Sequence, residues 1–106
     1  MATFTAKSLA DGQVANAEGD LYAVPASTKA YIKSVNFLNT SATTQTLDVY
    51  IKRSGATSRH LRRYVLDQFQ SATFEFAGCL SAADAIRAVS TTNTVVNYVI
   101  TGVEEA

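Results

Sequence analysis

Apolar and polar residues alternate along two stretches of the chain, residues 28–39 and 45–53, which are joined by the short polar segment 39–45. Successive side chains of a strand point to opposite faces. Strict alternation therefore divides the side chains of the first stretch between two faces. One face carries Tyr31, Lys33, Val35 and Phe37, and the other carries Ala30, Ile32, Ser34, Asn36 and Leu38. In the second stretch it turns Leu47, Val49 and Ile51 inward. Short Asn, Ser and Thr side chains favour a turn between the two, so the pattern predicts an antiparallel pair.

The same periodicity recurs along the rest of the chain and predicts about eight strands. They are expected near residues 2–9, 20–24, 28–39, 45–53, 59–66, 72–77, 85–91 and 94–102. Strands spaced about ten residues apart predict an all-β fold, a single antiparallel β-sandwich of jelly-roll-like type spanning residues 1–106. Residues 1–19 carry few large apolar side chains, which favours an extended N-terminal arm. A helix over 81–89 competes, but we expect a turn at 81–84 followed by a strand, because Thr-rich sequence follows.

Several short motifs resemble those of a known group of proteins. They are Tyr22-Ala-Val-Pro-Ala26, a strand with Val35 leading into Asn39-Thr-Ser41, Ala85-Ile-Arg-Ala88, and Asn97-Tyr-Val-Ile-Thr-Gly-Val-Glu104. In these motifs the chain resembles small β-sandwich structural proteins of tailed bacteriophages, although Ala82-Ala83-Asp84 stands in place of the family's Gly-Asp turn. The resemblance implies a β-sandwich that is part of a virion.

Composition narrows the setting. The 106 residues suit one domain, and the nine basic and nine acidic residues give a formal net charge of zero, which favours neither nucleic acid nor a membrane surface as partner. The single Cys79 excludes an intrachain disulfide and is expected to be a small buried apolar residue. The N-terminus lacks the pattern of a secretory leader and no apolar run is long enough for a membrane span, so we expect folding in a host cytoplasm.

Residues that carry chemistry are sparse. His60 is the single histidine, and no carboxylate is placed in the sequence to orient its ring, so a surface role is expected. One Cys and one His do not supply a zinc site. Glu18-Gly-Asp20 could hold calcium, but it lacks EF-hand spacing and reads more simply as a solvated turn. Glycine-rich phosphate loops are absent. We therefore predict no catalytic residues, no metal and no cofactor.

Charge is distributed unevenly. Six basic side chains fall within twelve positions, namely Lys52, Arg53, Arg59, His60, Arg62 and Arg63, whereas Glu104 and Glu105 lie near the C-terminus. The segment from Lys52 to Arg63 is the predicted basic hairpin, and we use that name for the whole strand pair 45–66 that contains it. Together with Tyr64, these basic residues predict a surface for an acidic protein partner, or for Glu104 and Glu105 of a neighbouring subunit. A solvated face is the equal alternative. Weaker alternatives are nucleic-acid binding, with Lys and Arg on the phosphates and Tyr64 stacking, and glycan binding by Tyr50 beside Asp48.

The function expected from these observations is a non-enzymatic bacteriophage virion protein that binds other virion subunits. Within that class we expect a capsid decoration or cement protein, trimeric, bound to the major capsid protein in many copies. The alternatives are a tail, neck or fibre-attachment component and, from another class, a carbohydrate-binding adhesion module for a host glycan.

Overall fold

The computed structural model describes residues 4–75 and 78–105, and this part of the chain is built of nine β-strands without a helix. The strands are β1 (Phe4–Val14), β2 (Gly19–Ala23), β3 (Lys29–Asn39), β4 (Gln45–Lys52), β5 (Arg59–Leu66), β6 (Ser71–Phe74), β7 (Gly78–Leu80), β8 (Ala85–Ser90) and β9 (Val96–Glu105). The predicted all-β class is therefore confirmed. In the described residues there is no helix long and apolar enough to cross a membrane.

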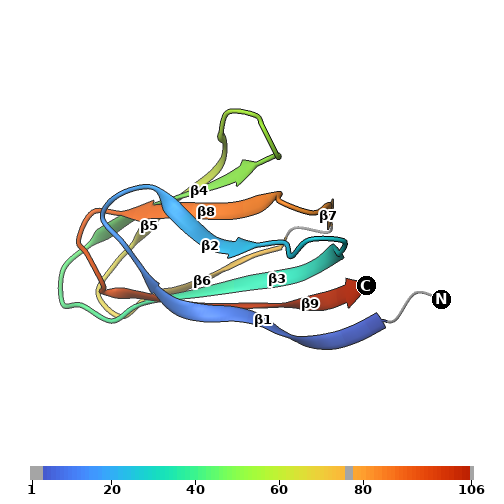
Figure 1. Cartoon of the computed structure of the whole chain (residues 1–106). Helices are drawn as coiled ribbons and strands as arrows, with labels where there is room; N and C mark the ends of the chain where they lie inside the picture. Colours follow the sequence, from blue (N-terminus) through green and yellow to red (C-terminus); the bar gives the residue numbers. More distant parts are fainter. Residues whose placement is uncertain (1–3, 76–77, 106) are drawn as a thin grey trace.

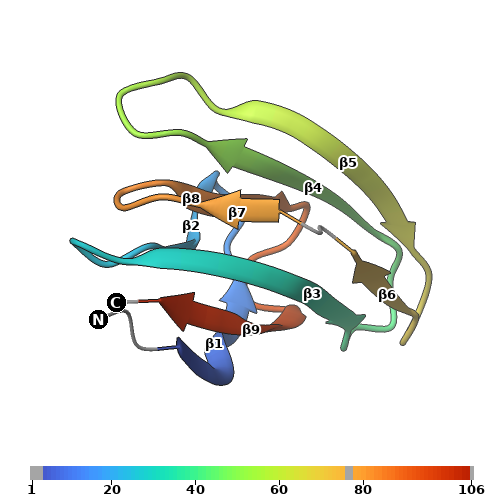
Figure 2. The same cartoon turned by 90° about the vertical axis from the view of Figure 1, so that its right-hand side faces the viewer.

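The strands form two antiparallel sheets that pack face to face (Figures 1 and 2). One sheet has the order β1-β9-β3-β6, with β7 also paired to β3, and the other has the order β2-β8-β4-β5. The predicted antiparallel pair of residues 28–39 and 45–53 is therefore wrong, because the polar turn between β3 and β4 carries the chain from one sheet to the other. β6 and β7 pair with successive parts of β3 and so occupy one strand position interrupted near residue 75. Counted in that way, each sheet has four strand positions, and consecutive positions lie in opposite sheets except β4 and β5, which is a jelly-roll-like order. The strand predicted over 72–77 corresponds to β6, whereas β7 was not predicted.

The core lies between the two sheets. Leu47, Val49 and Ile51 of β4 point into it, as their alternation predicted, and Val96, Tyr98 and Ile100 of β9 do the same. The largest buried apolar side chains come from both sheets and include Phe37, Leu47, Leu66, Leu80, Ile86 and Ile100. Alternation also predicts Phe74 and Phe76 in the core; Phe74 is there, whereas Phe76 lies outside the described residues.

The predicted faces of β3 are wrong, because a β-bulge at Lys33 changes which residues point inward. Ile32 pairs with Gly102 and Ser34 with Thr101, so Lys33 is an extra residue without a partner in β9. Ala30 and Ile32 are buried before the bulge, and Val35 and Phe37 are buried after it. A bulge of this kind moves the inward set by one residue, so both halves of the strand contribute to the core.

Gly102 lies where two bulges meet. β1 has its own extra residue, Leu9, between the pairs Ser8–Thr101 and Ala10–Ile100. A Cβ atom on Gly102 would collide with the carbonyl oxygen of Tyr31 and come within 3.1 Å of Leu9 Cδ1. Only glycine allows this approach of neighbouring backbone.

The expected N-terminal arm is wrong for the residues that the structure describes. β1 pairs with β9 from Phe4 to Val14 and forms one edge of the larger sheet (Figure 1). Few apolar side chains are needed there, because an edge strand is held largely by backbone hydrogen bonds to its single neighbour. Residues 1–3 of the expected arm lie outside the described residues.

Two buried polar side chains fix the turns around the sandwich. Asn39 is fully buried, and its Nδ2 donates to the carbonyl oxygens of Thr43, Leu66 and Asp67 at 2.8–3.1 Å. Asp84 ends the turn at 81–84, which leads into β8 as predicted. Buried polar groups with complete hydrogen bonds specify one arrangement of the loops.

Candidate protein-binding surface

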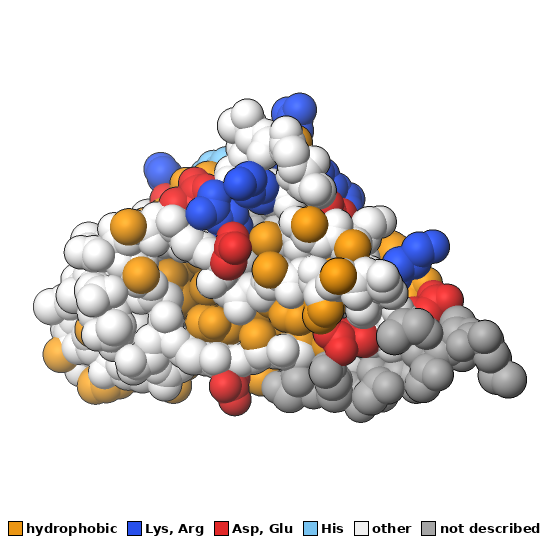
Figure 3. Space-filling model, in the orientation of Figure 1, with side chains coloured by type: hydrophobic (Ala, Val, Ile, Leu, Met, Phe, Trp, Pro, Cys, Tyr) orange, Lys and Arg blue, Asp and Glu red, His pale blue; other side chains and the backbone are white. Residues whose placement is uncertain are grey.

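The basic hairpin is formed by β4, β5 and the connecting residues 53–58, and it extends beyond the body of the sandwich (Figures 1 and 2). The amide of Ala56 donates to the carbonyl oxygen of Arg53 at 2.9 Å, and Gly55 adopts a φ of 72°, which suits glycine. β5 is an edge strand whose first five residues are all exposed. Lys and Arg side chains gather on and beside this projection, with acidic side chains next to several of them (Figure 3).

Asp84 anchors the start of the loop. Its carboxylate accepts hydrogen bonds from the amide of Ser54 at 2.8 Å, the amide of Ser81 at 3.0 Å and Nη1 of Arg53 at 2.9 Å. Burial alone would raise the pKa of Asp84, but the two amide hydrogen bonds and the Arg53 guanidinium outweigh it and lower that pKa. Arg53, predicted as an interface residue, is therefore engaged within the chain.

The outer side of the hairpin carries a second carboxylate, Asp48. Arg63 Nε donates to Asp48 Oδ1 at 2.7 Å, and His60 Nε2 lies 3.0 Å from the same oxygen. The hydrogen bond from Arg63 lowers the pKa of Asp48, against the raising effect of partial burial. The expectation that no carboxylate orients His60 is wrong, because antiparallel pairing brings Asp48 opposite Arg63. Among the described residues, His60 has no hydrogen bond with a Ser, Thr or Cys.

The outer face continues onto β8, where Arg87 pairs with Glu18 and Asp20, the two acidic residues considered above as a calcium site. Arg87 Nη1 donates to Glu18 Oε2 at 2.9 Å, and its Nε makes an ionic contact with Asp20 Oδ1, also at 2.9 Å, that is too poorly aligned for a hydrogen bond. Ser58 from the hairpin loop donates to the same Glu18 oxygen at 2.6 Å. Both carboxylates are thus paired with a guanidinium, and no cluster of three metal-binding side chains occurs among the described residues.

The inner side of the hairpin, which faces the larger sheet, carries Arg59, Leu61, Arg62 and Tyr64. A bulge in β5 leaves Leu61 without a partner, because Val49 pairs with Arg62 and Tyr50 with His60. Arg62 lies over the ring of Tyr64 at 5.5 Å, and the Tyr64 ring contacts Phe37 of the core at 6.3 Å between centroids. Tyr64, predicted as an interface residue, is therefore partly buried.

A pocket of about 230 Å³ lies on this inner side, lined by Ile51, Arg53, Ala56, Thr57, Arg59 and Leu61. Sequence reasoning missed it, because the bulge that adds Leu61 leaves no signal in the pattern. Within the described part of the chain, Arg59 and Lys52 make no ion pair. Of the six predicted basic residues, Lys52, Arg59 and Arg62 therefore keep charge that no acidic side chain of the described part neutralises.

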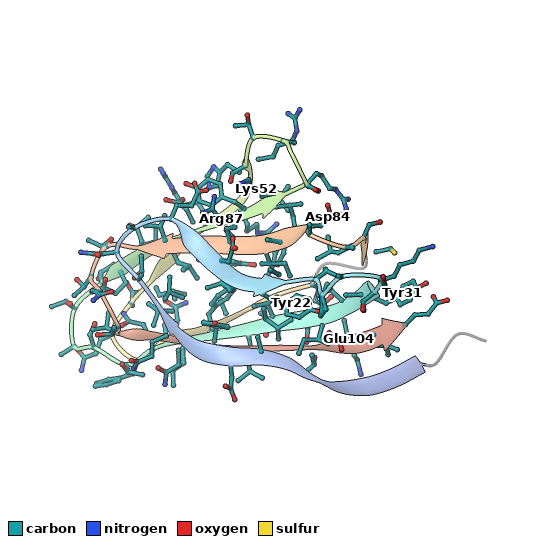
Figure 4. The ribbon with its side chains drawn as sticks, in the orientation of Figure 1. Tyr22, Tyr31, Lys52, Asp84, Arg87 and Glu104 are labelled. Carbon is teal, nitrogen blue, oxygen red and sulfur yellow. The ribbon has the colours of Figure 1, made fainter. Side chains whose placement is uncertain are left out.

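Glu104 and Glu105 lie at the end of β9 and are held by tyrosines. The Tyr22 hydroxyl donates to Glu104 Oε2 at 2.5 Å, and the Tyr31 hydroxyl donates to Glu105 Oε1 at 2.6 Å. Burial, followed by this hydrogen bond, raises the pKa of Tyr22 far above its usual value. Figure 4 places Tyr22, Tyr31 and Glu104 together, apart from Lys52 at the hairpin. The two predicted halves of the interface are thus on separate parts of one chain.

Three further features differ from expectation or were missed. Cys79 is exposed and not buried, because it lies on the short strand β7 opposite Tyr31, which is also exposed. On the outer face of the larger sheet, an open hollow of about 330 Å³ contains Leu38 and Val99 and has no charged side chain in its described lining. The Tyr50–Asp48 pair considered for a glycan is engaged within the chain, since Tyr50 packs against His60 at 5.0 Å.

No protein-family model matches the chain, and no curated protein matches its sequence. Two solved structures resemble it in fold. One is of Bacillus endospore appendages, described as a novel family of disulfide-linked pili, with a TM-score of 0.59, 16% identity, and coverage of 98% of this chain and 88% of that one. The other is from the acid-stable capsid of Helicobacter pylori bacteriophage KHP30, with a TM-score of 0.54, 16% identity, and coverage of 100% and 94%. At this identity, the likeness establishes a common fold.

Proposed function

We propose that the chain is a non-enzymatic structural protein of a bacteriophage virion, and within that class a capsid decoration or cement protein that binds the shell in many copies. The observation that carries this proposal is the likeness to a chain of the bacteriophage KHP30 capsid, which extends over almost the full length of both chains. Their similar length favours a small accessory subunit. The motif resemblance to structural proteins of tailed phages points the same way.

The side chains of the described residues support binding in place of catalysis. The single histidine is held by Asp48 without a nucleophile, and the carboxylates of Glu18, Asp20, Asp48 and Asp84 are all paired with cationic groups. The hydrogen bonds therefore stabilise loops. Two surfaces of the described part of the chain that could receive a partner are the inner side of the hairpin and the hollow around Leu38 and Val99.

Assembly as a trimer stays a proposal, as does the contact between the hairpin and Glu104 and Glu105 of a neighbouring subunit. Each glutamate accepts a tyrosine hydrogen bond, and a carboxylate can accept more than one donor. A charge swap tests the contact: Arg59→Glu should weaken the oligomer, and Glu105→Arg in the same chain should restore it. Loss in both single variants without rescue in the double variant argues against direct pairing.

A second candidate is a subunit of a self-assembling appendage, favoured by the likeness to the endospore pili. A disulfide-linked filament needs at least two cysteines per subunit, whereas this chain has one. A single thiol can join only two chains. The appendage role would therefore require non-covalent contacts between subunits, as would a tail or fibre-attachment role.

The deciding experiment measures the mass of the purified chain by light scattering, alone and after mixing with phage heads that lack it. A fixed oligomer that saturates heads at high copy number supports decoration. Filaments formed without heads support the appendage role, and a few copies per particle support a tail or neck component. Deleting residues 1–19 is not a suitable test of contacts, because the deletion removes an edge strand.

A further inference from the structure

The pocket on the inner side of the hairpin combines an apolar lining with cationic groups. Ile51 is buried beneath it, and Leu61, which is 44% exposed, contributes an apolar wall. Arg53 and Arg59 line the same space, from the two sides of the loop. An apolar surface beside guanidinium groups suits an occupant that carries an apolar group next to an anion.

The charges around the pocket differ in availability. Arg53 Nη1 is held by Asp84 and by the carbonyl oxygen of Cys79 at 3.2 Å. Arg59 makes no hydrogen bond or ion pair with the described residues, so its guanidinium donors face solvent. An anion bound here would therefore pair with Arg59 without breaking an internal ion pair. The pair would be bidentate if the anion were a carboxylate.

The size of the pocket limits the occupant. At about 230 Å³ it is smaller than the usual sites for drug-sized ligands, which begin near about 300 Å³. One large apolar side chain fits such a space better than a complete cofactor or sugar. The occupant is therefore best described as a side chain of another polypeptide.

The edge of the sheet supplies the other part of the site. β5 lies at the end of the order β2-β8-β4-β5, so one row of its backbone N–H and C=O groups faces away from β4. Edge strands of this kind accept an added strand from a partner. Leu61 and the adjacent pocket give one apolar residue of such a strand a defined position.

A second copy of β5 is a poor partner for this edge. Antiparallel pairing centred between residues 62 and 63 would place Arg62 opposite Arg63 of the second copy, and pairing centred on Leu61 would place Arg59 opposite Arg63. Like charges directly opposite each other destabilise a strand pair. The charge of the edge thus opposes self-association and favours an acidic strand.

We propose that the β5 edge and its pocket bind an extended acidic segment of a partner protein, which adds to the sheet, places one apolar side chain in the pocket and pairs a carboxylate with Arg59. This inference deepens the proposed function, because it identifies the class of segment that a virion partner would present. It assigns the binding charge to Arg59 and Arg62, and not to the whole basic run.

The test uses a fluorescein-labelled twelve-residue peptide with a central Leu, with Asp or Glu two positions before and after it, and with Thr or Val elsewhere, so that the Leu and the carboxylates share one face of the added strand. Two control peptides have Lys in place of the acidic residues or Ser in place of the central Leu. We expect saturable binding of the acidic peptide by fluorescence anisotropy, and binding at least tenfold weaker for both controls. Equal binding of the acidic and Lys peptides, or no binding of the acidic peptide at 1 mM protein, which is on the order of the weakest specific contacts, overturns the inference.

Variants of the chain distinguish peptide binding in the pocket from non-specific attraction between the basic hairpin and the acidic peptide. Arg59→Glu removes the carboxylate partner, and Ala56→Phe fills the space, so each should weaken peptide binding tenfold or more. Lys33→Glu makes the same change in net charge at an exposed position of β3, away from the pocket, and should leave peptide binding within twofold of that of the unchanged chain. If Arg59→Glu and Ala56→Phe fold, by the same β-sheet circular dichroism, and bind the peptide like Lys33→Glu, the pocket is not the site.

The same variants mixed with phage heads separate this inference from the proposed function. Head binding that survives Arg59→Glu and Ala56→Phe overturns the inference and leaves the decoration role intact. Peptide binding without head binding overturns the decoration role and leaves the pocket assignment intact. Tighter binding of a single-stranded oligonucleotide than of the acidic peptide overturns the assignment to a protein partner.

Discussion

Removal of the Asp84 carboxylate should destabilise the protein and release the base of the hairpin. Asp84 is buried and accepts from the amides of Ser54 and Ser81 and from Arg53. Each amide bond to a charged acceptor contributes about 1.5 kcal/mol, the low end for such bonds, because both serines lie in exposed turns that water can reach. The ion pair adds about 0.5 kcal/mol, since the Arg53 side chain is half exposed. We expect Asp84→Ala to cost about 3–4 kcal/mol in total.

Urea denaturation of the two chains measures this loss as a lower midpoint at unchanged slope. Asp84→Asn keeps one acceptor oxygen without the charge, so it should cost about half as much as Asp84→Ala. Asp48→Asn is the matched control. It removes a carboxylate of lowered pKa from the exposed outer side of the hairpin, where a smaller loss of about 1 kcal/mol or less is expected.

The pH dependence tests the role of the charge. Because the pKa of Asp84 is lowered in the folded chain from its usual 3.8, the stability that it contributes is present above pH 3.8 and is lost as the pH falls through the lower, folded value. The difference between the unchanged chain and Asp84→Asn should therefore be constant from pH 7 to 5 and shrink below pH 3.8. Because Asp48 is present in both chains, its contribution cancels in the difference between their free energies of unfolding. A difference that stays the same at pH 7 and pH 3 would refute the reasoning.

Three other predictions concern single side chains. Gly102→Ala should lower the free energy of unfolding by about 3 kcal/mol or more in urea denaturation, because the added Cβ meets the backbone of β3. Gly19→Ala, with only one neighbouring atom at 3.8 Å, should lower it by less than about 1 kcal/mol. Equal losses in the two variants would contradict the packing at the two bulges. Cys79 should react with a thiol reagent to one equivalent without denaturant, and protection until unfolding would show that it is buried. Tyr22 should ionise well above pH 10.0 in an ultraviolet titration, so the stability that its protonated hydroxyl contributes is present below pH 10.0 and is lost as the pH rises through the raised pKa. Glu104→Gln should lower the pKa of Tyr22 without returning it to the usual value, since burial is the larger cause. Ionisation near pH 10.0 in the unchanged chain would count against the hydrogen bond.

Much of the fold was predictable because most strands obey period-two alternation. The inward residues Leu47, Val49 and Ile51 of β4 and Val96, Tyr98 and Ile100 of β9 follow this alternation. The turn at 81–84 followed by β8 was also predicted. The bulges were not, because one extra residue changes the register without a composition signal. The chain around Lys33 reads as one regular strand, although the residue is left out of the pairing with β9. Gly102 was the available sign of close backbone approach.

The candidate site was predicted only in outline, since its partners come from distant parts of the sequence. The basic run was visible, but its pairing with Asp84, thirty-one positions after Arg53, depends on how β8 lies beside β4. Asp48 could have been found, because it alternates outward on the strand that the hairpin places opposite Arg63. A basic run in a hairpin is thus best considered together with the outward residues of its pairing strand.

The internal pairing changes what the hairpin can contribute to binding. Lys52 is on the outer side with Tyr50, whereas Arg59 and Arg62 are on the inner side, so one flat partner surface meets at most two unneutralised cations. Exposed ion pairs contribute about 0–1 kcal/mol each, which is too little for stable attachment of one copy. The apolar pocket must supply more, and a shell-bound protein would need several linked contacts per oligomer to be retained. A monomeric variant should therefore dissociate from particles far faster than the oligomer, even though each of its contact surfaces is unchanged.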